Sequence, residues 1–314
     1  MATINWSGVY PALLTPFDNN GQVDFSMYKI NLDAQIAAGV DGVIIGGSLG
    51  EASTLLRQEK KELLIYSKEI ADAGFPVLVN IAEQSTKEAI DQAKEAEANG
   101  ADGLMLLPPM RYKASDEETV RFFMDVANKT SLPILLYNNP VDYKIEITLD
   151  MFEQMLPCKN IEAVKESTRN TMNITRMINR FGDRYKILTG VDPVALESLV
   201  VGADGWVAGL VDAFPAETVA IFRLVKAGRI QEALAIYRWF MPLLELDIQP
   251  KLVQYIKLAA SITGIGSEYV RAPRLVLTGD ERTTVLKTIH DALAVRPVLP
   301  DYLHLKTHAD ANWA

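Results

Sequence analysis

Hydrophobic residues recur along the first two thirds of the chain in short runs rich in aliphatic and β-branched side chains. The eight runs are spaced roughly 20–35 residues apart, close to the length of one strand-plus-helix unit. They are nearly continuous rather than alternating, which is typical of strands covered on both faces. The predicted strands are Val9–Leu14, Gly42–Ile45, Val77–Ile81, Gly103–Leu107, Ile134–Tyr137, Ile161–Lys165, Lys186–Thr189 and Gly205–Ala208.

The segments between these runs have the period of amphipathic helices. In Ser85–Asn99 the alanines fall on one helical face and the charged residues on the other. Ser115 and Glu118 form a capping-box pattern that predicts the start of the next helix. Pro193 and Pro215 stand where a first helical turn accepts proline. After these, the predicted helices are Ala216–Ala227, Ile230–Leu246, Pro250–Thr263 and Thr283–Ala294.

A Gly-x-Asp-Gly motif occurs three times, at residues 39–42, 100–103 and 202–205, each time between a predicted helix and a predicted strand. The first glycine suits the end of a helix and the aspartate a tight turn. This repeated junction favours a TIM (β/α)8 barrel over residues 1–228, with a C-terminal helical domain over 229–314. A doubly wound open sheet is the alternative, but no Gly-x-Gly-x-x-Gly motif opens the chain. The polar tail from Pro300 to Ala314 is predicted to be loosely held.

Composition excludes several functional classes. The net charge of −9 argues against a nucleic-acid partner or an anionic membrane. The single Cys158 rules out an internal disulfide, and all three histidines fall in the last 25 residues. We therefore expect no metal site, no Ser-His-Asp triad and no cofactor. The N-terminus lacks a signal-peptide pattern and no run approaches about 18 apolar residues, so a cytoplasmic location is expected.

In a TIM barrel the active site lies at the carboxyl ends of the strands. The sixth predicted strand ends at Lys165, which has two interpretations. Its stem could be buried while its ammonium reaches water, or burial could disfavour the charged form and leave an amine able to form a Schiff base. Alone, Lys165 favours the first interpretation.

Two other strand ends change that balance. The loop Gly46–Glu51 is not a P-loop, but its glycines would let backbone N–H groups approach a carboxylate. Ser48 would add a hydroxyl donor, and a helix that follows the loop would add a favourable dipole. A plain glycine turn is the other interpretation. Tyr137 could be a buried phenol with a structural partner, or the proton carrier that Schiff-base chemistry requires. Together with Lys165, these groups predict an imine-forming lyase acting on a 2-oxo acid.

These residues, in this order, resemble the dihydrodipicolinate synthase/N-acetylneuraminate lyase family, from about Gly8 to Leu277. The motifs that carry the resemblance are Gly46-Gly47-Ser48-Leu49-Gly50-Glu51, Tyr137-Asn138-Asn139-Pro140, Val164-Lys165-Glu166-Ser167 and, more weakly, Gly190-Val191-Asp192. The family implies a TIM barrel with a C-terminal helical domain, assembled as a homotetramer from a dimer of dimers.

The resemblance also implies roles for individual residues. Lys165 matches the Schiff-base lysine and Tyr137 the catalytic tyrosine, with Ser48 as the third catalytic residue. Gly47 and Ser48 match the carboxylate-binding pair, Val207 matches a residue whose backbone lines the pocket, and Asn139 is expected to contact substrate.

Three departures from the family pattern indicate a particular branch. Leu49 replaces the second of two adjacent threonines, and Met110 or Pro109 stands where a tyrosine usually crosses the dimer interface. Asp142 replaces the arginine that usually follows the Tyr-Asn-x-Pro motif. Because a hydroxyl relay cannot pass through leucine and methionine, dihydrodipicolinate synthase activity is disfavoured. N-acetylneuraminate lyase activity is disfavoured too, since Leu49 removes a polar group from a pocket for a polyhydroxylated substrate.

Residues 107–113 and 137–141 look most like the branch that converts Δ1-pyrroline-4-hydroxy-2-carboxylate to 2,5-dioxopentanoate, with loss of ammonia and water, in hydroxyproline breakdown. Leu49 and Met110 would make the pocket smaller and more apolar. The enzymatic alternative is an aldolase or dehydratase of a 2-oxo-3-deoxy sugar acid or of 4-hydroxy-2-oxoglutarate. A non-catalytic 2-oxo acid sensor is the alternative outside enzymes.

Overall fold

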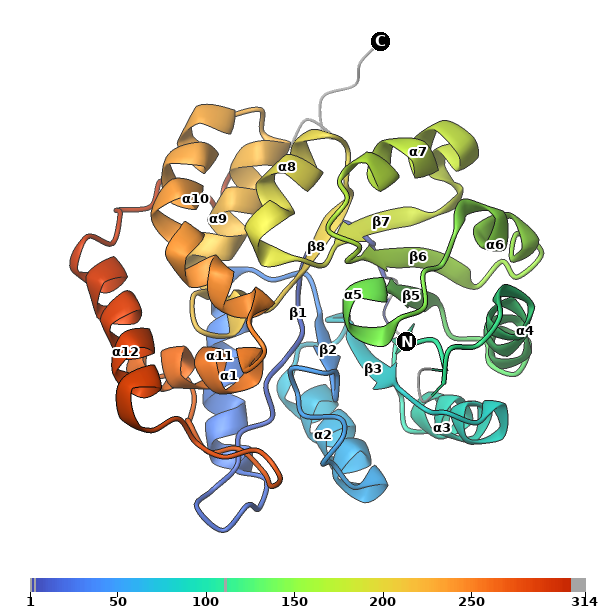
Figure 1. Cartoon of the computed structure of the whole chain (residues 1–314), viewed down its shortest axis with the longest axis horizontal. Coiled ribbons are helices and arrows are strands. Elements are labelled where there is room, and N and C mark those ends of the chain that lie inside the picture. The colour runs from blue at the N-terminus through green and yellow to red at the C-terminus, as the bar shows by residue number, and fades with distance from the viewer. Residues whose placement is uncertain (1, 3, 110–111, 306–314) are drawn as a thin grey trace.

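Eight parallel strands form the centre of the protein, seen in the computed structural model of Figure 1. The structure describes residues 2, 4–109 and 112–305. All eight predicted strands are present, and three of them match the prediction at both ends. The strands are β1 (Gly8–Pro11), β2 (Val43–Ile45), β3 (Val77–Ile81), β4 (Gly103–Leu106), β5 (Ile134–Asn138), β6 (Ile161–Glu166), β7 (Lys186–Thr189) and β8 (Gly205–Ala208).

Each strand pairs in parallel with its neighbour along the sequence, and β1 pairs with β8. The remaining seam, between β1 and β2, is joined just beyond β1. There Ala12 bridges Ile44, and the Leu13 N–H donates to the Ile44 carbonyl at 2.9 Å. This closes the sheet into the TIM barrel that the strand spacing predicted, and the doubly wound alternative is wrong.

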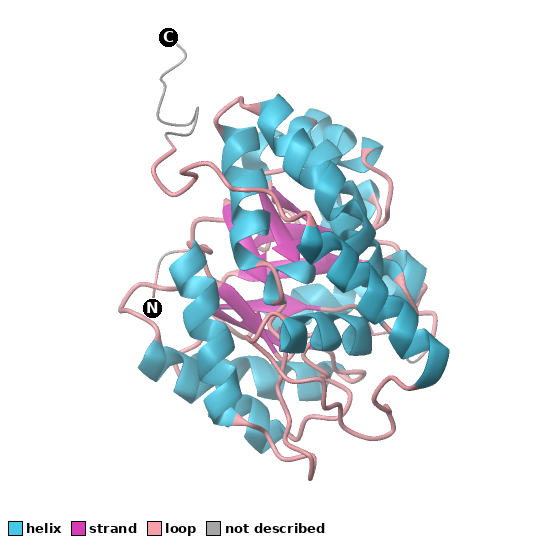
Figure 2. Cartoon of the chain, turned by 90° about the vertical axis from the view of Figure 1, so that its left-hand side faces the viewer, coloured by secondary structure: helices cyan, strands magenta, loops and turns pink. Residues whose placement is uncertain are grey.

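Helices surround this barrel on the outside (Figures 1 and 2). Those that follow strands are α1 (Phe25–Ala38), α2 (Arg57–Ile70), α3 (Thr86–Ala98), α4 (Asp116–Ala127), α5 (Pro140–Tyr143), α6 (Leu149–Gln154), α7 (Met172–Phe181), α8 (Ala195–Val200) and α9 (Pro215–Lys226). The predicted caps hold, because Ser85 and Ser115 each accept the backbone N–H of the third residue of their helix. Pro193 opens a 3₁₀ turn, Asp192–Val194, before α8 rather than α8 itself.

The three Gly-x-Asp-Gly motifs make the same junction at the amino ends of the strands. Gly39, Gly100 and Gly202 all have positive φ, as the end of a helix requires. Each aspartate exchanges two hydrogen bonds with the first residues of the preceding strand, one through its backbone N–H and one through its carboxylate. The pairs are Asp41–Val9, Asp102–Val77 and Asp204–Ile187.

The C-terminal segment folds into α10 (Ile230–Leu244), α11 (Leu252–Ile262) and α12 (Gly279–Ala294). α12 begins before the predicted Thr283, and α10 ends in a 3₁₀ turn, Glu245–Ile248. The Trp239 indole donates to the Ala292 carbonyl at 2.8 Å, which ties α10 to α12. The boundary at residue 228 stays a prediction.

The tail differs from the prediction as far as residue 305. Leu299, Tyr302 and Leu305 pack against the hydrophobic core, and Leu303 lies so close to Gly39 that a Cβ there would meet it at 2.7 Å. Apolar residues inside a polar stretch therefore hold this part of the chain. The rest of the predicted loose tail lies outside the described residues.

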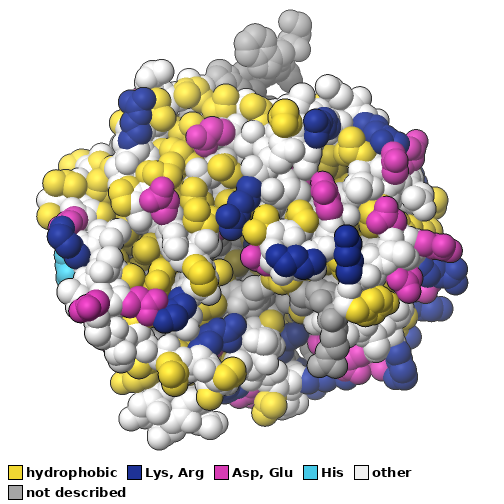
Figure 3. Space-filling view, in the orientation of Figure 1, with side chains coloured by type: hydrophobic (Ala, Val, Ile, Leu, Met, Phe, Trp, Pro, Cys, Tyr) yellow, Lys and Arg dark blue, Asp and Glu magenta, His cyan; other side chains and the backbone are white. Residues whose placement is uncertain are grey.

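Basic and acidic side chains are interspersed on the face seen in Figure 3. In the described part of the chain, no helix is both long and apolar enough to cross a membrane.

The aspartate junction gives a stability prediction. Asp102 is buried and accepts N–H groups from Ala2 and Val77 as well as an ion pair from Lys68 at 2.6 Å. Asp102→Ala should lower the free energy of unfolding by about 2–4 kcal/mol, because it leaves a buried N–H without an acceptor. The exposed Asp33→Ala is the control, expected within about 0.5 kcal/mol of the parent. Equal urea midpoints for the two variants would contradict the assignment.

Candidate active site

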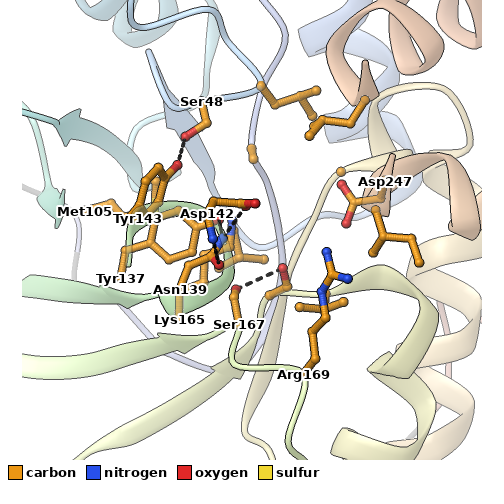
Figure 4. Close-up of a pocket in the computed structure, with 18 residues that line it drawn as sticks. Ser48, Met105, Tyr137, Asn139, Asp142, Tyr143, Lys165, Ser167, Arg169 and Asp247 are labelled. Atoms are coloured by element: carbon orange, nitrogen blue, oxygen red, sulfur yellow. Dashed lines mark hydrogen bonds between the residues drawn. The ribbon is translucent and has the colours of Figure 1, made fainter. Parts of the chain in front are cut away.

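A pocket opens at the carboxyl ends of the strands (Figure 4). It brings together side chains from most barrel strands and from the C-terminal segment. The lining residues are Ala12, Ser48, Leu49, Met105, Tyr137, Asn139, Asp142, Tyr143, Lys165, Ser167, Arg169, Gly190, Val191, Val207, Gly209, Asp247, Ile248 and Leu252.

Lys165 lies on β6 with its side chain inside this pocket rather than in water. Only 6% of the residue is exposed, and its Nζ lies 4.2 Å from the centre of the Tyr137 ring. Burial lowers the pKa of Lys165, and the nearby carboxylates and Tyr143 only partly oppose this effect. The interpretation of Lys165 as a side chain reaching bulk water is therefore wrong. The amine is placed to react as a nucleophile.

Gly190 at the end of β7 makes room for Lys165. A Cβ on Gly190 would come within 2.6 Å of the lysine Cε and 2.2 Å of the Ser167 Oγ. Ser167 donates to the Gly190 carbonyl at 3.0 Å. A side chain at the first position of the 190–192 motif would therefore clash with Lys165 and Ser167, which explains the glycine there.

Tyr137 at β5 pairs with Lys165 across neighbouring strands. Its hydroxyl accepts a hydrogen bond from Asn139 Nδ2 at 3.2 Å, and the same amide donates to Asp142 at 2.7 Å. Burial raises the pKa of Tyr137, so the phenol keeps its proton near neutral pH and can donate it. Asn139 thus orients two polar groups of the pocket.

The loop 46–51 adopts a turn whose shape depends on glycine. Gly46 has a φ of 62°, and a Cβ on Gly50 would come within 2.8 Å of the Leu13 carbonyl. Among the described residues, no acceptor faces the backbone N–H groups of Ser48 and Leu49. They are therefore free to bind a carboxylate.

The helix dipole predicted for this loop is wrong. Residues 51–54 form turns, and α2 begins only at Arg57. The backbone of the turn itself must therefore supply the donors for an anion.

Glu51 connects this loop to the C-terminal helices. Its carboxylate forms an ion pair with Lys257 of α11 at 2.5 Å, and both side chains are completely buried. Glu51 also accepts the Arg271 backbone N–H at 3.2 Å, and its φ of 59° lies in the left-handed region. Lys257 in turn donates to the Tyr269 carbonyl at 2.7 Å. The loop is thus held from behind by the last third of the chain.

Tyr143 is a pocket residue that the sequence analysis missed. Its hydroxyl is hydrogen-bonded to Ser48 Oγ, and its ring meets the Tyr137 ring edge-on with centroids 5.5 Å apart. Burial raises the pKa of Tyr143, so this phenol also keeps its proton. Nothing in the hydrophobic pattern marks Tyr143, because the short α5 turn alone brings it over Ser48.

Two neighbouring aspartates, Asp192 and Asp247, lie at the barrel mouth near Lys165. Only Asp192 belongs to a motif identified in the sequence. Asp192 accepts hydrogen bonds from the Trp206 indole at 2.9 Å and the Leu210 N–H at 2.7 Å, as well as from the Gly209 N–H. Asp247 lies on the 3₁₀ turn after α10, and among the described residues it accepts one hydrogen bond, from the Asp192 N–H at 3.4 Å. No sequence motif signals Asp247, because the C-terminal segment brings it to the barrel.

The other predicted site residues have mixed outcomes. Val207 and Leu49 line the pocket, and Gly47 lies beside Ser48 without lining it. Tyr112, two residues after the position where the family usually has an interface tyrosine, is 56% exposed and does not line the pocket. Met110 lies outside the described residues, and Met105 contributes an apolar side chain to the pocket lining.

The geometry can be compared with known proteins. The sequence profile of the Dihydrodipicolinate synthetase family matches residues 5–292. The chain belongs to this family. Its members are class I Schiff-base lyases, so the chain is an enzyme of that type. No group of three or more potential metal-ligating side chains occurs in the described ranges.

Relatives and solved structures of this family cover nearly the whole chain. The 4-hydroxy-tetrahydrodipicolinate synthase of Bacillus subtilis is 29% identical over 92% of this chain and 100% of its own length. That of Methanococcus maripaludis is 31% identical over 85% of this chain and 91% of its own. The structure of the synthase from Methylacidiphilum fumariolicum superimposes with a TM-score of 0.86, at 31% identity over 95% of this chain and 99% of that one.

The lowered pKa of Lys165 predicts how its reactivity depends on pH. Only the neutral amine attacks a carbonyl, so the rate of reductive trapping with pyruvate should rise with pH. It should reach its plateau below 10.5, the ordinary lysine value, because burial destabilises the ammonium. Mass spectrometry of the adduct at each pH measures the rate and confirms the position of labelling. A rate at Lys165 that keeps rising through 10.5 would contradict the burial argument.

Proposed function

We propose that the protein is a Schiff-base deaminase that converts Δ1-pyrroline-4-hydroxy-2-carboxylate to 2,5-dioxopentanoate. The supporting observation is Asp142 at the pocket rim, where the family usually has an arginine, held 2.7 Å from Asn139. A carboxylate there repels a second substrate carboxylate and favours a small acid with only one. Leu49 and Met105 make the adjoining wall apolar, which fits a five-carbon skeleton.

In the proposed reaction Lys165 adds to C2 of the cyclic imine, and the ring nitrogen leaves C2 as a primary amine. The substrate carboxylate binds the N–H groups of Ser48 and Leu49. Loss of a C3 proton gives an enamine, whose electrons expel the 4-hydroxyl as water. After proton shifts, hydrolysis at C5 releases ammonia and hydrolysis at C2 frees Lys165. One water leaves and two are consumed, so the net reaction takes up one water, and the net loss of water expected for this branch from the sequence is wrong.

Several of these steps move protons, and the hydroxyl groups of Tyr137, Tyr143 and Ser48 line the pocket together with Lys165. Tyr137 and Tyr143 are both protonated phenols, and Tyr143 is already hydrogen-bonded to Ser48. We assign to these three hydroxyl groups the proton transfers that accompany formation and hydrolysis of the imine at C2. A hydroxyl pair within one chain also weakens the argument that Leu49 and Met110 alone exclude synthase activity.

The runner-up is a 4-hydroxy-tetrahydrodipicolinate synthase, the activity named for the relatives. Arg169 favours it, because this exposed cation lines the pocket and could bind a second carboxylate. An aldolase or dehydratase of a sugar-derived 2-oxo acid, and a non-catalytic sensor, remain the further alternatives. We also infer a homotetramer from family membership.

A substrate panel tests the proposal. The purified chain should release ammonia and 2,5-dioxopentanoate from the pyrroline in equal amounts, and Lys165→Ala should release neither. No ammonia, combined with condensation of pyruvate and aspartate semialdehyde, would establish the synthase instead. Pyruvate release from 4-hydroxy-2-oxoglutarate would establish an aldolase. Trapping at Lys165 without turnover of any substrate would favour a sensor.

Tyr143→Phe should separate proton transfer from binding. The variant keeps the aromatic ring but loses the Tyr143 hydroxyl that is hydrogen-bonded to Ser48. We therefore expect kcat to fall by about 10²-fold while KM changes by less than about threefold. Steady-state kinetics on the best substrate of the panel measures both. The exposed Tyr112→Phe is the matched control and should behave like the parent. An unchanged kcat in Tyr143→Phe would remove Tyr143 from the mechanism.

A further inference from the structure

Asp247 faces the pocket from outside the barrel. It lies on the 3₁₀ turn Glu245–Ile248, and Figure 4 shows it across the pocket from Tyr137 and Lys165. Its position is fixed by the end of β8, since a Cβ on Gly209 would come within 2.5 Å of Asp247 Oδ1. A substrate bound to Lys165 through C2 would therefore occupy the same pocket as the Asp247 carboxyl group.

The environment of Asp247 favours a proton on its carboxyl group. Burial raises the pKa of its neighbour Asp192, but three N–H donors aimed at the Asp192 carboxylate oppose this effect and stabilise its ionised form. Asp247 receives one N–H from the described residues, that of Asp192, at 3.4 Å. Of two neighbouring carboxyl groups, the one with fewer donors holds a proton more readily. Burial and the charge of Asp192 raise the pKa of Asp247 to about 8.

Charged groups on other elements also shift the pKa of Asp247. Lys165 of β6 lowers its pKa, whereas Asp142 of α5 raises it. Arg169, from the loop after β6, lines the same pocket (Figure 4). Because Lys165 loses its charge as it reacts, the proton on Asp247 is held more firmly once the amine is neutral.

We propose that Asp247 is the general acid that protonates the 4-hydroxyl group of the substrate as it leaves. This inference rests on the proposed function, whose elimination step needs a proton on the oxygen of the 4-hydroxyl group. The enamine electrons form the C3–C4 double bond, and the C4–O bond breaks. The oxygen takes the Asp247 proton and leaves as water. The Asp247 carboxylate then balances the positive iminium formed at Lys165.

A leaving-group comparison tests this role. Asp247→Asn keeps the shape of the side chain but cannot donate the acid proton. With 4-hydroxy-2-oxopentanoate, kcat for elimination should fall by about 10²-fold or more. With 4-fluoro-2-oxopentanoate, fluoride leaves without a proton, so the variant should eliminate within about tenfold of the parent. Reductive trapping of Lys165 with pyruvate, which has no C4, should be unchanged within a few-fold.

Two further measurements distinguish catalysis from structure. Elimination by the parent should decline above about pH 8, where Asp247 loses its proton, and this decline should be absent in Asp247→Asn. Glu245→Gln, on the same turn but exposed, is the matched control and should match the parent. Equal losses with both leaving groups, or loss of trapping in step with turnover, would assign Asp247 a structural role instead.

The outcome is separable from the proposed function. If the pyrroline yields no ammonia, that function is wrong, yet the two open-chain acids still report on Asp247. A parent enzyme that releases fluoride but never dehydrates the hydroxy acid lacks an acid at this position, and the inference fails. Failure with both acids overturns it as well.

Discussion

The buried ion pair between Glu51 and Lys257 is the constraint on which the site depends. Two charges without solvent access are stable only with each other and with further hydrogen bonds, which Arg271 and Tyr269 provide. The pair fixes a non-glycine residue in the left-handed region at the end of the 46–51 loop. It also ties α11 of the C-terminal segment to this loop at the barrel mouth. The loop that carries Ser48 and the helices that follow the barrel are therefore joined by a buried interaction.

The reactivity of the pocket follows from unequal environments for similar groups. Lys165 loses more by desolvation than its acidic neighbours restore, so its amine is more readily neutral. Burial also raises the pKa of Tyr137 and Tyr143, because it disfavours the phenolate, so both phenols keep their protons. Asp192 and Asp247 differ in the number of N–H donors that each receives. One pocket thus holds an amine that burial makes less basic, two phenols that keep their protons, and two neighbouring carboxyl groups.

Much of the fold was predictable because barrel strands are short, apolar and evenly spaced. Ser85, Ser115 and the Gly-x-Asp-Gly junctions were also predictable, since their partners lie nearby in sequence or at a repeated spacing. Lys165 and Tyr137 were found as strand-end residues, which a barrel brings to one mouth. The position of α2 and the packing of residues 299–305 were not, because both depend on neighbours far along the chain.

The sequence by itself determined the strand order and the family, and it placed Lys165 and Tyr137 at strand ends, because these depend on local pattern and on residues that follow each strand. Only the tertiary structure decided that Tyr143 contacts Ser48 and that Asp247 faces Lys165 across the pocket. Ser48 and Tyr143 lie on different loops, and Asp247 follows the barrel altogether. No periodicity connects them. Their proximity comes from barrel closure and from helices packed across its mouth, which are long-range contacts that a single sequence does not display.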